Sequence, residues 1–364
     1  MDERVKIGIF HWTLPSVGRK VGGVEVFVHR LALSLVATPN SVEVISLTDA
    51  PEDATYSHRK IFRRFPFLRK KIFRLWLMPA LMNFVDFKRY DVVHFHGDDG
   101  LYFFRKIPTV RTFYGSARFE SRMATSKKRK YAQLFVYQLE RLSSKLSDLV
   151  VGVGIETIKL YNADAIGKLF ISQDLFFPGD KSKDPTFVFI GAWEGRKRGK
   201  FVAEEFLNKI LPQAPNAKLF MASDFVPASD SIVDLHHPSN KVLAKIIRES
   251  WALLSASTYE GFGIPYLEAI TSGTVTVTSP NPGAEFVLDN GKYGFIVSDD
   301  SYADTVLELI RSSELRREYE LIGLARASEF SEMEVITEHL DWYRVAIERF
   351  SKVRSKVVRK PAAG

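Results

Sequence analysis

Short apolar runs alternate with amphipathic helical stretches along the first half of the chain. A strand at 5–10, a helix at 24–36 with apolar residues at helical spacing, and a strand at 41–47 open this series. Strands that alternate with helices in this way are typical of a parallel, doubly wound α/β sheet. The pattern continues with predicted strands at 91–96, 109–113 and 148–153 and a helix at 128–146.

A second series of the same kind begins near residue 185. Its strands are predicted at 186–191, 217–222, 251–257, 274–278 and 294–297, and its helices at 200–211, 241–250 and 265–272. The stretch 177–185 between the two series is polar and rich in helix breakers, so we predict a linker there. A chain of 364 residues is long enough for two cores. The sequence therefore predicts two α/β domains, at 1–180 and 185–340.

Charge is unevenly distributed between these halves. The chain carries a net charge of +8, but residues 1–180 alone carry +10 and the remainder −2. An anionic surface or partner facing the first domain would explain this asymmetry. The chain has no cysteine, no stretch long and apolar enough to span a membrane, and an apolar strand directly after its first residues. These features favour a cytoplasmic protein.

The most informative segment runs from Ser257 to Ala269, after the predicted strand 251–257. Gly261 and Gly263 form a loop through which a ligand could approach the main chain, and Pro265 suits the first position of a helix. The N–H groups of that helix would favour phosphate. Glu260 and Glu268 could both accept hydrogen bonds from the paired hydroxyls of a sugar or a ribose. An ordinary turn with two surface carboxylates is an equal alternative on these local features.

Three cations follow the strand 186–191. Arg196, Lys197 and Arg198 stand between that strand and the next helix. Fixed cations at such a position can stabilise the negative charge on a departing diphosphate. A solvated basic turn is the alternative interpretation.

Several of these segments together resemble the retaining glycosyltransferases of the GT-B fold, in particular glycosyltransferase family 4. Glu260 and Glu268, with seven residues between them, match the family's paired-glutamate motif. The glycine-containing loop at 279–287 and the N-terminal segments 22–25 and 91–97 resemble further landmarks. The resemblance implies two Rossmann-like doubly wound domains that face a central cleft. It also implies that the helix and tail at 341–364 pack back on the first domain.

By this resemblance, the donor is a nucleotide-diphosphate sugar, with UDP or GDP as its nucleotide, and the sugar passes to a hydroxyl acceptor with retention at the anomeric carbon. Glu260 would contact donor-sugar hydroxyls, and Glu268 would bind the ribose. The catalytic prediction comprises Glu260, Arg196 and Lys197. The remaining predicted donor-binding residues are Gly23, Arg198, Gly261, Phe262, Gly263, Ile264 and Glu268.

Two positions depart from the family pattern. Ala192 stands where the family has an arginine, and the basic run is shifted, so which of the three cations binds the diphosphate stays open. Tyr114 stands where the family often has a histidine. His96 and Tyr114, each at a predicted strand end, are candidates for contact with the acceptor or the donor sugar, although a lone histidine there is as often structural.

No cofactor or metal ion is predicted. Asp98–Asp99 and Asp299–Asp300 are adjacent pairs in loops, a pattern typical of turns rather than of a metal site. Hence we expect transfer without a metal ion.

Residues 59–77 interleave basic with aromatic and aliphatic side chains and contain no acidic residue. This composition suits an anionic membrane surface, and suggests a glycan or lipid-linked acceptor at the inner face of the cell membrane. A helix that packs its apolar face on the sheet is an equal alternative. Nucleic acid is not expected, because no nucleic-acid-binding motif accompanies the basic residues.

Two other functions fit parts of the pattern. A GT-B-shaped sugar-nucleotide epimerase would require catalytic acids or bases but no acceptor, and the paired-glutamate motif argues against it. A non-catalytic sugar-nucleotide-binding scaffold would explain the departures at Ala192 and Tyr114. Turnover of a nucleotide sugar distinguishes these alternatives.

Overall fold

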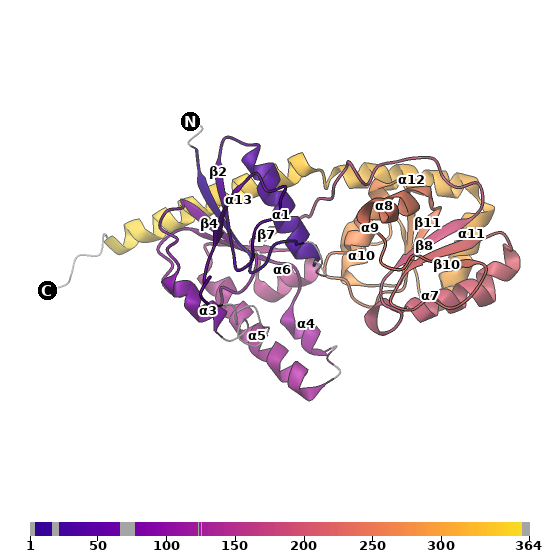
Figure 1. Cartoon of the computed structure of the whole chain (residues 1–364), viewed down its shortest axis with the longest axis horizontal. Helices are drawn as coiled ribbons and strands as arrows, with labels where there is room; N and C mark the ends of the chain where they lie inside the picture. Colours follow the sequence, from indigo (N-terminus) through magenta and orange to yellow (C-terminus); the bar gives the residue numbers. More distant parts are fainter. Residues whose placement is uncertain (1–3, 17–21, 66–76, 123, 125, 359–364) are drawn as a thin grey trace. The chain divides into compact units, whose positions relative to one another are not determined.

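The computed structural model describes residues 4–16, 22–65, 77–122, 124 and 126–358. The chain divides into two compact units (Figure 1). The first unit contains residues 1–169 and 332–364, and the second contains residues 170–331. Each unit is an α/β structure with its own parallel sheet, as the alternation of apolar and amphipathic segments predicts.

The first unit is built on a parallel sheet with the strand order β3-β2-β1-β4-β5-β6-β7. Its inner strands are buried on both faces, because helices cover both sides. The strand bounds are β1 Lys6–Phe10, β2 Ser41–Ser46, β3 Ser57–Lys60, β4 Val92–Phe95, β5 Thr109–Phe113, β6 Leu149–Gly152 and β7 Ala165–Ile166.

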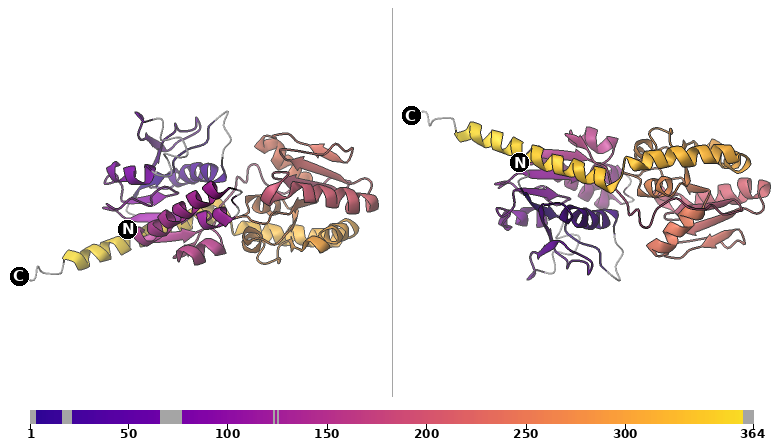
Figure 2. Two further views of the ribbon diagram at one scale, coloured as in Figure 1. Left: turned by 90° about the horizontal axis from the view of Figure 1, so that it is seen from below. Right: turned by 90° about the horizontal axis from the view of Figure 1, so that it is seen from above.

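The last helix of the chain belongs to this first unit. Helix α13 packs against β4, β5, β6 and α1, and Figure 2 shows it lying along the sheet. Helices α4 and α5 lie side by side and project from the same unit (Figure 1). The helix bounds are α1 Gly23–Val36, α3 Met78–Leu81 with the short helix η2 Met82–Phe84, α4 Ala117–Arg122, α5 Lys127–Leu146, α6 Ile155–Tyr161 and α13 Glu332–Val358.

The second unit is built on a parallel sheet with the order β10-β9-β8-β11-β12-β13. A cluster of buried apolar side chains from β8, β9, β11, β12 and the neighbouring helices forms its core. The strand bounds are β8 Thr186–Ile190, β9 Lys218–Ala222, β10 Ile232–Asp234, β11 Ala252–Ser255, β12 Val275–Thr278 and β13 Phe295–Ile296. The helix bounds are η3 Gly195–Lys197, α7 Gly199–Glu205 continued by η4 Phe206–Ile210 and η5 Leu211–Gln213, α8 Asn240–Glu249, α9 Ile264–Thr271, α10 Pro282–Val287, η6 Asp299–Ser301, α11 Tyr302–Arg311 and α12 Ser313–Ser328.

The boundary between the units differs from the predicted linker at 177–185. That segment is bound to the second unit: Lys181 Nζ donates to the carbonyl of Arg248 at 2.9 Å and to Thr274 Oγ1 at 2.8 Å. The side chain of Arg248 also stacks on Phe177, 4.1 Å from its ring centre. The polar composition of the segment therefore reflects hydrogen bonding to α8 and its surroundings, and the division lies at 169/170 instead of 180/185.

The C-terminal segment that packs on the first unit also begins earlier than residue 341, where the sequence predicted it to begin. Helix α13 starts at Glu332, and the division places residues 332–340 with the first unit instead of the second. Val335 and His339 are buried there, and the His339 ring lies 6.2 Å from that of Phe27 on α1. The first helical turns of α13 thus already pack on the first unit.

In the described part of the chain, none of the helices is long and apolar enough to cross a membrane. Of the basic and aromatic segment 59–77, the structure describes 59–65 and 77, and residues 66–76 lie outside the described residues. Arg59 and Lys60 belong to the edge strand β3.

Candidate functional site

The loop after β11 is shaped by glycine. Gly263 has φ +91°, a left-handed conformation that favours glycine, and it directly precedes α9. A Cβ at this position would lie 2.4 Å from the ring of Tyr266. Pro265 is the second residue of α9 rather than the predicted first, a position where its missing N–H is still tolerated. Gly273, with φ +63°, follows the end of the helix as predicted.

The N-terminus of α9 has no side-chain cap. By contrast, Ser126, Ser239, Asn281 and Ser312 cap helices α5, α8, α10 and α12. The first N–H groups of α9 are therefore not engaged by a capping side chain, and the partial positive charge of the helix end is available to an anion. The donor-binding role of the main chain around Phe262, Gly263 and Ile264 stays a prediction.

Two of the three predicted cations converge on Glu260. Glu260 Oε1 lies 2.9 Å from Arg196 Nη1 and 2.5 Å from Lys197 Nζ. Arg196 Nη1 also donates to the carbonyl of Tyr259 at 2.6 Å, and the N–H of Thr258 donates to the carbonyl of Arg196 at 2.9 Å. The basic turn after β8 and the loop after β11 are thus joined, and the predicted catalytic residues form one cluster in the second unit.

Glu260 is ionised in this cluster. Burial raises the pKa of its carboxyl, but the positive charges of Lys197 and Arg196 act in the opposite direction and outweigh it, so the pKa lies below its usual value. One carboxylate faces two cations, which leaves the cluster with a net positive charge. An anionic group can therefore still bind beside Glu260.

Arg198 is oriented differently from its two neighbours. Its backbone is left-handed, with φ 56°, and its guanidinium pairs with Asp299 at 3.0 Å and 2.5 Å. The same group stacks on Phe201, 4.2 Å from the ring centre. Among the three predicted cations, Arg198 is therefore occupied by a contact to η6, and it does not contact Glu260.

A buried polar network supports the Glu260 loop, and the sequence did not predict it. Asn281 Nδ2 donates to the carbonyl of Ser257 at 3.1 Å and to the hydroxyl of Tyr266 at 3.0 Å, while its Oδ1 caps α10. A Cβ on Gly283 would lie 2.8 Å from both Glu260 Cβ and the carbonyl carbon of Phe262. The turn between β12 and α10 therefore packs directly against the Glu260 loop.

The other predicted residues of this loop lie where the motif places them. Glu268 is on α9 and half-buried. The side chain of Phe262 is buried against Phe286 and Phe330, with ring centres 5.7 Å and 5.9 Å away. Phe262 therefore anchors the loop through its ring, and only its main chain can serve a ligand.

The N-terminus of α1 resembles that of α9. Gly23 is the first residue of α1, and the preceding Gly22 provides no side-chain cap. Both glycines are exposed. The first unit therefore also contains a glycine-bearing helix N-terminus, and the approach of this loop to the donor phosphates stays a prediction.

His96 and Tyr114, which follow β4 and β5, contact each other. His96 Nδ1 lies 2.5 Å from the hydroxyl of Tyr114, and the two rings stack at 5.8 Å. Burial, followed by the neighbouring His94 and His11, lowers the pKa of His96 well below its usual value, so the ring is neutral. Its Nε2 is buried, and in the described part of the chain it has no hydrogen-bond partner. Contact of this ring with the acceptor or the donor sugar stays a prediction.

Asp99 is not the turn residue that its adjacency to Asp98 suggested. It is buried, with Oδ2 2.9 Å from Arg105 and Oδ1 3.2 Å from Arg111, and it accepts a hydrogen bond from Ser143. Asp299 and Asp300 do lie in a turn, η6, as predicted, and Asp299 pairs there with Arg198. Among the described residues, no group of three histidine, aspartate or glutamate side chains is arranged to hold a metal ion.

Two family models match this chain. Residues 21–161 match Glycosyltransferase Family 4, and residues 228–322 match Glycosyl transferases group 1. The first match includes Gly23, His96 and Tyr114, and the second includes Glu260 and Glu268. Together the two matches cover more than half of the chain.

Similar proteins support the same assignment. A GDP-mannose:cellobiosyl-diphosphopolyprenol alpha-mannosyltransferase of Xanthomonas oryzae pv. oryzae is 22% identical, over 90% of this chain and 94% of that protein. Sucrose-phosphate synthase from Thermosynechococcus elongatus has a TM-score of 0.72 at 16% identity, covering 94% of this chain and 98% of the other. Anabaena HepE in complex with UDP and glucose has a TM-score of 0.67 at 13% identity, covering 93% and 98%. With its two Rossmann-like units and both family matches, the chain belongs to the glycosyltransferases of the GT-B fold, of the family 4 type.

Proposed function

We propose that this glycosyltransferase takes its sugar from a nucleoside-diphosphate sugar and transfers it with retention at the anomeric carbon, without a metal ion. The observation that carries the proposal is the convergence of Arg196 and Lys197 on Glu260, next to the uncapped N-terminus of α9. Both features favour a diphosphate beside a carboxylate that can accept hydrogen bonds from a sugar.

The two cations would act on the leaving group. When the bond between the sugar and the diphosphate breaks, negative charge develops on the diphosphate oxygens. Arg196 and Lys197 are held in place by Glu260 before the donor binds, so little reorganisation is needed as that charge forms. The N–H groups at the start of α9 would add to this stabilisation. These groups together would replace the charge neutralisation that other transferases obtain from a metal ion.

The two glutamates would have separate tasks. Glu260, ionised between two cations, would bind hydroxyls of the donor sugar, and Glu268 on α9 would bind the ribose hydroxyls. Because Glu260 is held by its ion pairs, it is better suited to orient the sugar than to attack it as a nucleophile. A phosphate oxygen of the donor would then take the acceptor's proton on the same face, which gives retention.

Relatives guide the choice of substrates. The Xanthomonas protein is named for GDP-mannose and a diphosphopolyprenol-linked acceptor, and HepE was solved with UDP and glucose. We therefore propose a UDP- or GDP-sugar as donor and a glycan or lipid-linked hydroxyl as acceptor. The basic first domain would place such an acceptor reaction at the inner face of the cell membrane.

A thermal-shift screen followed by an assay of nucleoside diphosphate release tests this proposal. UDP, GDP, ADP and dTDP and their sugars are screened first, because a bound nucleotide raises the unfolding temperature by mass action. The stabilising donor is then incubated with and without polyprenol-linked and glycan acceptors. Acceptor-dependent diphosphate release supports the proposal. Stabilisation without release identifies a scaffold, and interconversion of the sugar without an acceptor identifies an epimerase.

The two glutamate roles are separated by two variants and a control. Glu268→Ala should weaken binding of both donor and free nucleotide. Glu260→Ala removes the carboxylate but keeps the charges of Arg196 and Lys197, so it should weaken free-nucleotide binding far less than donor binding and should abolish transfer. Glu249→Ala, on the second-unit helix α8, is the matched control and should change neither. Equal behaviour of the two site variants would show that the division of roles is wrong.

A further inference from the structure

Three phenylalanine side chains are exposed on one part of the first unit. Phe84, at the end of η2, is 82% exposed, and Phe103 and Phe104, in the loop after β4, are 53% and 66% exposed. Exposed aromatic side chains that cluster together usually mark a surface that meets a partner. This aromatic patch, Phe84 with Phe103 and Phe104, has no role in the proposed donor site.

Hydrogen bonds fix the patch in place. Asn83 Oδ1 accepts from the N–H groups of Phe103 and Phe104 at 2.9 Å and 3.2 Å, and its Nδ2 donates to the carbonyl of Leu101 at 2.7 Å. This single side chain joins η2 to the loop 101–104. The backbone that carries Phe103 and Phe104 is therefore held to η2 by a specific contact.

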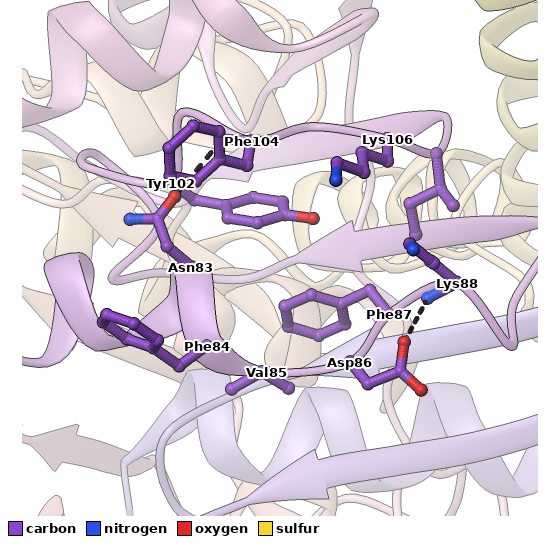
Figure 3. Close-up of a pocket in the computed structure, with 10 residues that line it drawn as sticks. Asn83, Phe84, Val85, Asp86, Phe87, Lys88, Tyr102, Phe104 and Lys106 are labelled. Carbon is purple, nitrogen blue, oxygen red and sulfur yellow. Dashed lines mark hydrogen bonds between the residues drawn. The ribbon is translucent and has the colours of Figure 1, made fainter.

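A pocket of about 250 Å³ lies beside the patch (Figure 3). Its apolar wall includes Phe87, Tyr102 and Ile107, and Figure 3 shows Lys88 and Lys106 on the same side of it. The two lysines are exposed, and the single carboxylate among the lining residues is Asp86, which accepts a hydrogen bond from the N–H of Lys88. Apolar and cationic groups thus share this surface.

Strand β3 of the same unit also carries positive charge. Arg63 and Arg64 are exposed in the turn after β3, and Phe62 in that turn packs on the core cluster that contains Tyr102 and Phe87. Arg59 on β3 donates to the carbonyl of Asp86 at 2.7 Å. Lys88 and Lys106 therefore lie beside the aromatic patch, within a half of the chain that carries a net charge of +10.

We propose that the aromatic patch, with Lys88 and Lys106, docks the protein on an anionic lipid bilayer. Phenylalanine rings gain free energy by entering the boundary between headgroups and acyl chains, and the lysines gain it from anionic headgroups. A second copy of this chain is a poorer partner, because basic borders would face each other across a symmetric interface. The pocket beside the rings can accept part of a lipid chain.

The aromatic patch is separate from the donor site. It would add a membrane-binding surface to the proposed function, because a docked enzyme would meet a lipid-linked acceptor at the membrane. Turnover of the donor in the absence of a lipid-linked acceptor does not require the enzyme to bind a membrane. The two proposals can therefore fail separately.

Flotation with lipid vesicles tests the inference. Wild type should float with vesicles that contain phosphatidylglycerol and float much less with phosphatidylcholine alone. Phe84→Ser combined with Phe103→Ser and Phe104→Ser should lower the partition coefficient on anionic vesicles by about tenfold or more. Lys88→Glu combined with Lys106→Glu should remove the preference for anionic lipid.

Matched variants in the second unit serve as controls. Leu321→Ser on α12 replaces an apolar side chain that is 51% exposed, and Lys241→Glu with Lys245→Glu on α8 reverses two exposed charges. Both controls should float like wild type. Thermal unfolding verifies that every variant is folded.

The absence of cysteine allows a direct measurement of insertion. Phe84→Cys introduces the single thiol of the chain, which can carry an environment-sensitive fluorophore. Its emission should shift to the blue with anionic vesicles, and the same label at Leu321→Cys should not respond. Equal flotation of the aromatic variant and wild type would overturn the inference. So would self-association that depends on the patch in the absence of vesicle binding.

Discussion

At the residue scale, the three cations that follow β8 do not share one partner, because the side chain of Arg198 points in another direction. Arg196 and Lys197 contact Glu260, whereas the left-handed backbone of Arg198 turns its guanidinium to Asp299. Three consecutive basic residues in a sequence do not show where each side chain points. The positive φ of Arg198 turns its side chain away from those of Arg196 and Lys197. The sequence favoured Arg196 and Lys197 over Arg198 for the diphosphate, but it did not predict that these two cations contact Glu260.

Charge removal at these positions should have unequal effects. Lys197→Ala should lower donor affinity and the transfer rate by tenfold or more, because it removes a cation beside the site of the leaving group, an effect of about 1.4 kcal/mol or more. Arg198→Ala should change affinity little and stability by less than about 1 kcal/mol, since its ion pair is partly exposed. Isothermal titration with nucleoside diphosphate and initial rates measure both. Equal losses of affinity would contradict this assignment.

Gly283 on α10 packs directly against the Glu260 loop. Gly283→Ala would place a methyl group 2.8 Å from Glu260 Cβ and from the main chain of Phe262, which cannot move aside as a flexible side chain would. The loop must shift, so transfer should fall by about a hundredfold, as misplaced catalytic groups do. Gly195→Ala is a contrasting variant: its Cβ would meet open space, although its φ of +73° adds backbone strain. Initial rates at saturating donor compare them.

At the element scale, the hydrophobic pattern predicted the strands with apolar sequences, but it missed three edge strands. The sequences of β3, β7 and β10 are SHRK, AI and IVD, short and partly polar. Edge strands pair on one side only and need not be apolar, so periodicity carries little information about them. The inner strands next to the site, β8, β11 and β12, were predicted within one or two residues.

The connection between β12 and α10 supports the site through Asn281. Asn281→Ala removes the cap of α10 and leaves the carbonyl of Ser257 without this donor, so the second unit should lose about 2–4 kcal/mol of unfolding free energy. Ser239→Ala removes only the cap of α8, at an exposed position, and should cost about 1 kcal/mol. Urea unfolding measures the difference. Similar losses for both variants would show that the buried network adds nothing.

At the scale of the whole molecule, two cores were predictable because the sequence contains two separate series of alternating strands and helices. The sequence contains less information about which unit the last helix packs on. Helix α13 follows the second unit in sequence but belongs entirely to the first unit, and its polar surface resembles that of any amphipathic helix. Only the buried contacts of Val335, His339 and Tyr343 show where it packs.

Those contacts give the first unit an acid sensitivity of its own. His94, His96 and His339 are buried, and burial lowers the pKa of each ring, to about 4 for His339. In the unfolded chain a histidine takes up its proton near pH 6.5. Between pH 6.5 and about 4 the unfolded state therefore binds more protons than the folded state, and stability falls as pH falls, by up to about 1.4 kcal/mol per pH unit for each histidine.

The second unit should respond later. The pKa of Glu260 is lowered, so its ionised form stabilises the fold above the unfolded value of about 4.3, and that contribution is lost only as pH falls further. Hydrogen exchange monitored across pH 7 to 4 should show the strands of the first unit opening before those of the second. His96→Gln, which removes one buried titrating ring, should reduce the slope of stability against pH in the first unit. An unchanged slope, or a second unit that opens first, would contradict this account, because the buried histidines would then not govern the acid response.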